Sequence, residues 1–85
     1  MDEITRLAFD LIDKHGVDRY PTVRDNLMKL VEEVGELFGD YLRGNNIADE
    51  LADIEICLRV LAHKADVNLN EAVRRKVESD TRSFV

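Results

Sequence analysis

Scarce residue types already narrow the fold and the location of this chain. Among its 85 residues there are one cysteine, one proline, four glycines and no tryptophan. The single cysteine, Cys57, excludes an internal disulfide, so we expect a reducing compartment. No basic segment precedes an apolar run at the start, and no apolar stretch approaches the ~20 residues of a membrane span. We therefore expect a cytoplasmic protein with no membrane partner.

Positive charge is also scarce. Lys and Arg total 12 against 18 Asp and Glu, which gives a formal net charge of −6. Because nucleic-acid-binding proteins usually present a basic face, we expect no nucleic-acid partner. A metal ion or a metal-bound polyphosphate suits this charge better. The length predicts a single domain over residues 1–85, and domains this small often need a metal or self-association for stability.

With so few prolines and glycines there is little room for loops, and the apolar spacing is helical almost throughout. Thr22 and Asn68 each precede an acidic residue by three positions, which is the pattern of a capping pair. Gly16 and Gly44 are expected to end helices, and Asn46 is expected to cap one. We expect helices over about residues 2–15, 22–43 and 46–65, and from 68 toward 84. This predicts an all-α fold, an antiparallel bundle of two long and two short helices.

The most informative feature is a set of acidic residues inside the two long helices. Glu33 and Glu36 are three positions apart and share one helix face. Glu50 and Asp53 repeat this spacing on the next helix. Both pairs lie beside the apolar stripe of their helix, at similar distances from the turn over 44–46. In an antiparallel hairpin the second pair therefore faces the first.

Such a cluster predicts a divalent cation. Half-buried carboxylates repel one another and resist desolvation unless a cation neutralises them. Oxygen ligands suit Mg²⁺ or Mn²⁺ better than Zn²⁺ or copper, and Mg²⁺ often shares its ligands with substrate phosphates. The alternative is a solvated acidic face, since 18 acids give such pairs by chance. Lys29, one turn before Glu33, is expected to form an ion pair with it.

Two segments resemble the signatures of the all-α nucleoside triphosphate pyrophosphohydrolases of the MazG-like family: KLVEEVGEL at 29–37 and ELAD at 50–53. The resemblance extends over roughly residues 24–82. It implies a Mg²⁺-dependent enzyme that hydrolyses a (d)NTP to (d)NMP and pyrophosphate, as in house-cleaning of the nucleotide pool. It also implies a homodimer or homotetramer whose facing subunits complete the bundle and the site. The metal ligands that it implies are Glu33, Glu36, Glu50 and Asp53.

Other residues are assigned roles with alternatives beside them. Glu36 is our choice for the catalytic group that accepts a proton from the attacking water. Lys76 and Arg82 are candidates for binding the leaving pyrophosphate, and exposed surface cations otherwise. Where many relatives carry an aromatic residue one turn after the second acidic pair, this chain has Cys57, which we expect to be a small buried filler.

Three other functions compete with this reading. A phosphoribosyl-ATP pyrophosphohydrolase-like enzyme shares the fold and the chemistry. A non-catalytic helical interaction module would use its acids only as a solvated surface. A redox-metal bundle is disfavoured, because neither histidine forms a Glu-x-x-His motif with an acid on the predicted face.

Overall fold

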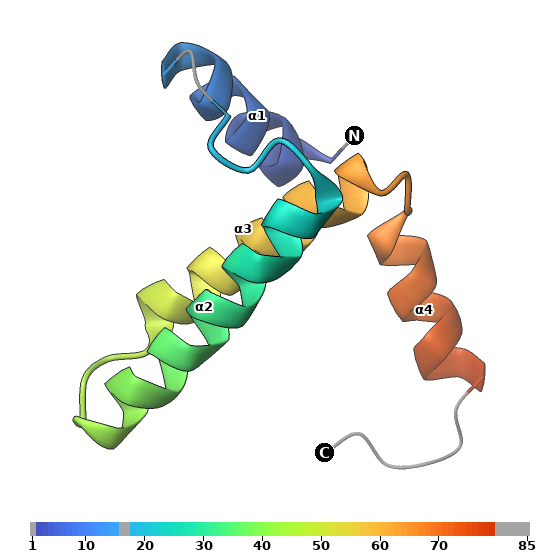
Figure 1. Cartoon of the computed structure of the whole chain (residues 1–85). Coiled ribbons are helices and arrows are strands. Elements are labelled where there is room, and N and C mark those ends of the chain that lie inside the picture. The colour runs from blue at the N-terminus through green and yellow to red at the C-terminus, as the bar shows by residue number, and fades with distance from the viewer. Residues whose placement is uncertain (1, 16–17, 80–85) are drawn as a thin grey trace.

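The computed structural model describes residues 2–15 and 18–79 (Figure 1). In chain order it contains α1 (Glu3–His15), α2 (Val23–Leu42), α3 (Ala48–Lys64) and α4 (Leu69–Ser79). The described residues contain no strand. The predicted all-α fold with two long and two short helices is therefore confirmed. The predicted continuation of the fourth helix toward Phe84 lies outside the described residues.

Side-chain hydrogen bonds explain where three of the helices begin. Thr22 and Asn68 each accept a hydrogen bond at 3.0 Å from the backbone N–H three residues later, as the capping pattern predicts. Asn46 accepts one at 2.8 Å from the N–H of Ala48. The N-cap of α3 is Ile47, so Asn46 closes a turn just ahead of the helix rather than forming the cap itself.

Both long helices end in the same backbone arrangement. Gly44 follows α2 with a φ of 74°, and Asp66 follows α3 with a φ of 56°. In each case this residue donates its N–H to the carbonyl three positions back, and the next N–H reaches the carbonyl five positions back. This is a Schellman motif, which satisfies carbonyls at the helix end. The predicted stop at Gly44 is confirmed, since glycine adopts a positive φ without a steric cost.

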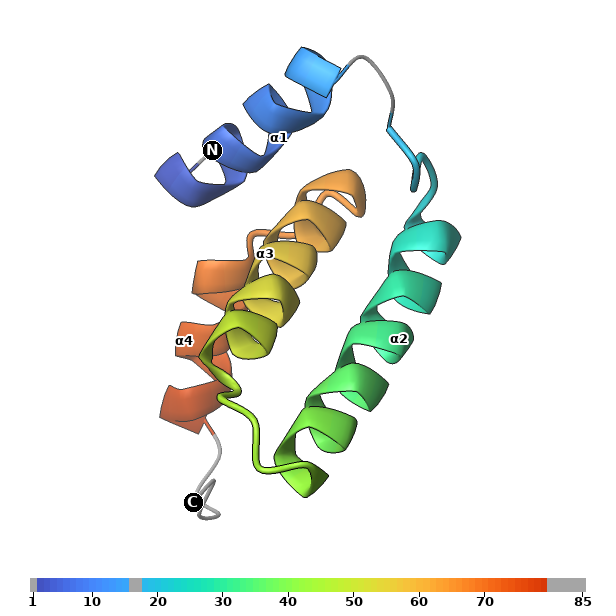
Figure 2. The same cartoon turned by 90° about the vertical axis from the view of Figure 1, so that its left-hand side faces the viewer.

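Helix α3 is the central element and contacts each of the other three helices. It forms an antiparallel hairpin with α2, while α1 packs near its C-terminal end (Figures 1 and 2). Among the described helices, α4 contacts α3 alone. None of the helices in the described part of the chain combines the length and the apolar character needed to cross a bilayer.

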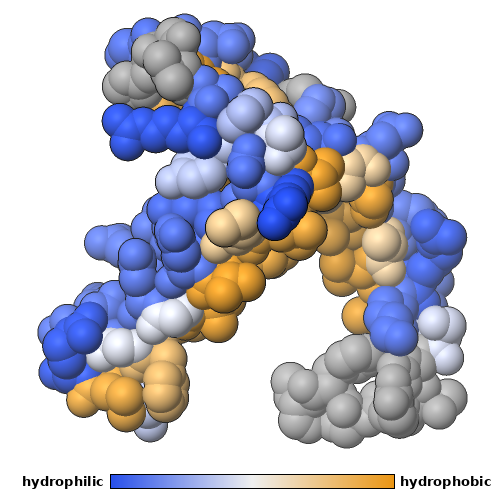
Figure 3. Space-filling view, viewed as in Figure 1, coloured by the Kyte–Doolittle hydropathy of each residue, from blue (hydrophilic) through white to orange (hydrophobic). Residues whose placement is uncertain are grey.

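Very little apolar surface is buried in this arrangement. Among the described residues, the buried hydrophobic side chains are Val60 and Ala62. The apolar stripe predicted for α2 is instead largely open: Val31 is 73% exposed and Phe38 62%. Figure 3 shows hydrophobic surface gathered on the concave side of the molecule, between the α2–α3 hairpin and α4. Helix spacing therefore identified the apolar face of α2, but one chain alone does not cover it.

Candidate metal centre and adjoining pocket

Three of the four predicted metal ligands meet where α2 faces α3. Glu33 comes from α2, and Glu50 and Asp53 come from α3. Each offers one carboxylate oxygen, and these three atoms lie within 4.8 Å of one another. The prediction that the acidic pairs face each other across the hairpin is confirmed for these residues. Their role as metal ligands stays a prediction.

Glu33 is the buried member of this acidic triad, with only 5% of its surface exposed. The ammonium of Lys29 lies 2.7 Å from its Oε1, which is the ion pair predicted from their spacing. Hydrogen bonding from Lys29 holds the pKa of Glu33 below its ordinary value, and in turn Glu33 raises the pKa of Lys29. The other oxygen, Oε2, is buried and has no hydrogen-bond partner among the described residues.

The pKa of Glu50 is shifted in the opposite direction to that of Glu33. Its pKa is raised to about 7, and the largest cause is the hydrogen bond that its neutral carboxyl makes with the carboxyl of Glu33. Burial and the carboxyl of Glu36 raise this pKa further, because all three favour the neutral form. Its Oε2, like that of Glu33, is buried, and when both groups are ionised neither oxygen has a hydrogen-bond donor among the described residues. Protonation of Glu50 supplies one hydrogen bond within the cluster, and a bound cation would neutralise both carboxylates instead.

The fourth predicted ligand, Glu36, lies at the edge of the triad. Its side chain is exposed, although its carboxyl is close enough to raise the pKa of Glu50. Three positions along an α-helix correspond to a rotation about 60° short of a full turn. When Glu33 points at α3, Glu36 is therefore rotated toward solvent. The four equivalent carboxylates expected from the sequence become three converging groups and one peripheral group.

The predicted phosphate-binding cations are not part of this cluster. Lys76 lies exposed on α4, and it is not among the residues that line the pocket beside the triad. Arg82 lies outside the described residues. Binding of pyrophosphate by Lys76 and Arg82 therefore stays a prediction.

A pocket of about 770 Å³ opens beside the triad. It lies between α1, the connector 18–22, α2 and α3, and Glu33 and Asp53 form part of its wall. Its other walls carry both apolar and polar side chains: Leu11, Ile12, Asp18, Arg19, Tyr20, Asn26, Lys29, Ile56, Cys57, Val60 and Lys64. The carboxylates therefore border a concave space large enough for a small organic molecule.

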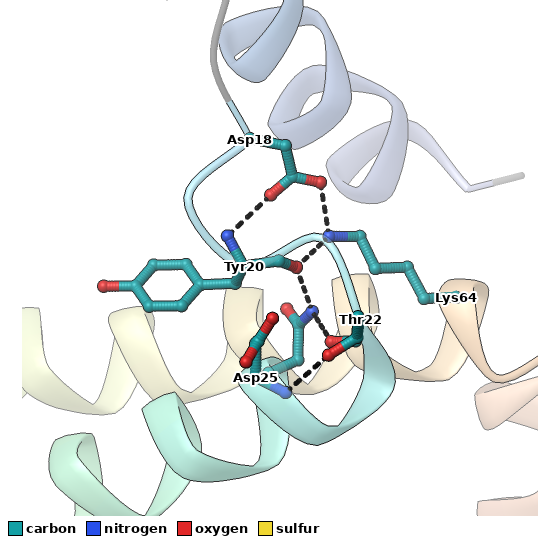
Figure 4. A network of polar contacts seen from close by, with 6 residues as sticks. Asp18, Tyr20, Thr22, Asp25 and Lys64 are labelled. Carbon is teal, nitrogen blue, oxygen red and sulfur yellow. Dashed lines mark hydrogen bonds and ion pairs between the residues drawn. The ribbon is translucent and has the colours of Figure 1, made fainter.

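Polar contacts fix the connector along this pocket (Figure 4). Lys64 donates to Asp18 Oδ2 and to the carbonyl of Tyr20, both at 2.6 Å. The amide of Asn26 donates to the same Tyr20 carbonyl at 2.6 Å and to the carbonyl of Thr22 at 2.8 Å. Hydrogen bonding from Lys64 also lowers the pKa of Asp18. These bonds tie residues 18–22 to α3 and to the first turn of α2.

Sequence reasoning did not identify this polar network. It assigned no role to Tyr20, Lys64 or Asn26. A signal for Asn26 was present, because it lies seven positions before Glu33 and therefore on the same helix face. A polar residue on a buried face is normally hydrogen-bonded, and Asn26 is only 4% exposed. Lys64 carried no comparable signal.

Cys57 also lines the pocket, half-buried on α3. Its Sγ donates a weak hydrogen bond to the carbonyl of Asn26, at 3.7 Å. Burial raises the pKa of this thiol, and the negative charge of Glu33 raises it further. The thiol is therefore held in its neutral form, which fits the predicted filler and not a reactive nucleophile.

The donor set suits a hard divalent cation. All three triad groups are carboxylates, and Mg²⁺ and Mn²⁺ prefer oxygen ligands. A cation there would neutralise the two buried oxygens and would lower the pKa of Glu50, which the neighbouring carboxyls raise. Comparisons of the chain with models of protein families, with curated proteins and with solved structures give no match.

Proposed function

We propose that this chain is a Mg²⁺-dependent nucleoside triphosphate pyrophosphohydrolase that hydrolyses a (d)NTP to a (d)NMP and pyrophosphate. The observation that carries the proposal is the convergence of three carboxylates in the described acidic triad, where Glu33 Oε2 and Glu50 Oε2 are buried and have no hydrogen-bond donor when both groups are ionised. Buried polar atoms are normally hydrogen-bonded or bound to metal, and an orphaned carboxylate oxygen is costly. The resemblance of the motifs at 29–37 and 50–53 supports the type of reaction. We propose removal of unwanted nucleotides from the cellular pool as the role of the enzyme.

The side chains divide the work as follows. Glu33, Glu50 and Asp53 hold the cation, and Lys29 orients Glu33 by its bond to Oε1, leaving Oε2 toward the triad. A bound divalent ion neutralises phosphate charge and lowers the pKa of water. Water then forms a bond to the α-phosphorus, the α–β bridging bond breaks, and pyrophosphate leaves with the electron pair. Glu36, exposed at the edge of the triad, accepts the proton of the attacking water.

We also propose that the chain works as a homodimer or homotetramer. A single copy buries few apolar side chains in its described part, while α2 exposes Val31, Phe38 and Tyr41. Apolar patches of this kind mark interaction surfaces, and an 85-residue chain with so small a core is marginal alone. A facing subunit would cover α2 and bring further cations, Lys76 and Arg82 among them, toward the pyrophosphate.

One alternative is favoured by a specific observation. The open apolar face of α2 also suits a non-catalytic helical interaction module. In that case divalent cations would leave thermal stability unchanged, and substitution of the triad carboxylates would leave partner binding unchanged. A phosphoribosyl-ATP pyrophosphohydrolase shares the proposed chemistry, and a nucleotide panel separates it from a (d)NTP enzyme.

The test is pyrophosphate release from a panel of dNTPs, NTPs and phosphoribosyl-ATP, with and without Mg²⁺. We expect Mg²⁺-dependent release, and its loss in Glu33→Gln and Asp53→Asn while the circular dichroism of the helices is retained. Glu32→Gln is the matched control, because Glu32 is an exposed neighbour on α2 outside the triad. Absence of monophosphate with every nucleotide from folded protein would contradict the proposal.

A further inference from the structure

The walls of the pocket beside the acidic triad combine two kinds of chemistry. They include the carboxylates of Glu33 and Asp53 and the aliphatic side chains of Leu11, Ile56 and Val60. A ligand that uses both carries a charged, cation-bound group joined to a less polar one. Inorganic polyphosphate supplies only the charged group, whereas a nucleotide has a phosphate chain and a flat ring system.

Tyr20 lines the same pocket and lies close to the triad. The ammonium of Lys29 lies 5.5 Å from the centroid of the Tyr20 ring. The same ammonium lies 2.7 Å from Oε1 of Glu33. The ring is therefore one side chain away from the buried carboxylate of the triad. An aromatic ring at this distance from the triad is placed to stack on a flat group of the ligand.

The backbone of Tyr20 is held from two directions. Lys64 of α3 donates to the Tyr20 carbonyl at 2.6 Å. It also donates, at 2.6 Å, to the carboxylate of Asp18, two positions before Tyr20. Asn26 of α2 donates to the same carbonyl at 2.6 Å (Figure 4). The Lys64 side chain is largely buried, at 12% exposure, so the pair with Asp18 is shielded from solvent. These contacts hold the backbone from which the Tyr20 ring extends, and none of them involves a triad residue.

We propose that Tyr20 stacks on the nucleobase of the substrate, and that Lys64 is a positioning residue that holds Tyr20 in place. This inference rests on the proposed function, because it takes the ligand to be a nucleotide. It assigns recognition of the nucleobase to the connector 18–22. Phosphate and cation are bound by the triad, and the base is bound by the connector. The two halves of the site therefore respond separately to substitution.

The experiment is isothermal titration calorimetry in the presence of Mg²⁺. The probes are the α,β-imido analogues of the four common dNTPs and, in parallel, inorganic tripolyphosphate, which has no base. Tyr20→Ala and Lys64→Met are expected to weaken binding of the tightest nucleotide about 10-fold, the scale of one lost stacking contact. Tripolyphosphate affinity is expected to stay within about twofold of wild type, and Tyr20→Phe is expected to bind the nucleotide normally, because the stacking ring is kept.

Arg59→Met is the matched control. Arg59 is another α3 cation that ties α3 to the N-terminal segment, through Asp2, but it does not line this pocket. It is expected to leave both affinities unchanged. Asp18→Asn removes the Lys64–Asp18 ion pair by changing the acidic partner. This variant replaces Lys64→Met in the experiment if Lys64→Met does not fold.

Each outcome has one meaning. Unchanged nucleotide affinity in Tyr20→Ala, or an equal loss for nucleotide and tripolyphosphate, would overturn the role of the connector. Nucleotide binding without hydrolysis by the wild-type protein would contradict the proposed enzyme and leave this inference supported. Failure of both probes to bind folded wild-type protein would overturn the two proposals together.

Discussion

Lys29 and Glu33 form an ion pair one helical turn apart, with 2.7 Å between Nζ and Oε1. The pair uses one oxygen of a buried carboxylate and leaves the other, Oε2, without a partner among the described residues. Lys29 is thus a built-in positive charge beside a group of acids that otherwise repel one another. It explains why the pKa of Glu33 is lowered, while the pKa of Glu50, whose carboxyl faces Glu33, is raised to about 7.

Replacing Lys29 by Met is expected to lower the melting temperature of the metal-free protein, because the buried Glu33 loses the counter-charge that Lys29 provides. Mg²⁺ is expected to raise the melting temperature of this variant by more than that of wild type, since the cation then meets an uncompensated carboxylate. Lys29→Arg keeps the charge and should resemble wild type. Equal melting temperatures of wild type and Lys29→Met without metal would contradict the role given to the pair.

The pH dependence of stability reports on Glu50. Its pKa rises from 4.5 to about 7 on folding, so the folded state binds this proton more tightly than the unfolded state. The stability that it contributes is fully present below about pH 4.5 and is lost as the pH rises through about 7. In metal-free protein, Glu50→Gln should remove this loss, because glutamine mimics the neutral acid. Urea unfolding of both proteins between pH 4.5 and 8 measures it, and parallel curves would rule the assignment out.

Substitution of Glu36 separates catalysis from metal binding. As the exposed carboxyl at the edge of the triad, Glu36 is assigned to the water and not to the ion. We expect Glu36→Gln to lower kcat by about 10²- to 10⁴-fold, the range of a lost general base, with Mn²⁺ affinity changed little. Calorimetry with Mn²⁺ next to steady-state kinetics makes the comparison. A large loss of Mn²⁺ affinity would return Glu36 to the ligand set implied by the motif.

A charge on the apolar face of α2 is expected to disrupt self-association. Val31 and Phe38 are 73% and 62% exposed in the single chain, so Val31→Asp and Phe38→Asp should not disturb packing within it. Light scattering after size exclusion is expected to show wild type at two or four times the monomer mass and each variant at the monomer mass. Arg24→Asp, an exposed polar position on the same helix, is the control. A monomeric wild type would contradict the proposed oligomer.

What the sequence predicted was local. Thr22, Asn68 and Gly44 act through bonds to neighbours within five residues, so their spacing is enough to predict helix limits. The meeting of Glu33 with Glu50 and Asp53 was predicted from the positions of the two acidic pairs on either side of one hairpin turn.

What the sequence did not predict depends on how elements cross. Lys64 reaches Asp18 from 46 positions away, and no periodicity encodes that contact. The outward rotation of Glu36 depends on which face of α2 turns toward α3. The open apolar face of α2 could not be read from its spacing, because spacing identifies an apolar face but not the chain that covers it.

The most direct test of the metal centre is an anomalous difference map from crystals of the wild-type protein grown with Mn²⁺. The account predicts a peak between α2 and α3, coordinated by Glu33, Glu50 and Asp53 at about 2.0–2.2 Å, close to the distances of hard divalent ions to oxygen. Crystals with millimolar Mn²⁺ that show no peak at the triad, or the three carboxylates turned apart into solvent, would contradict it.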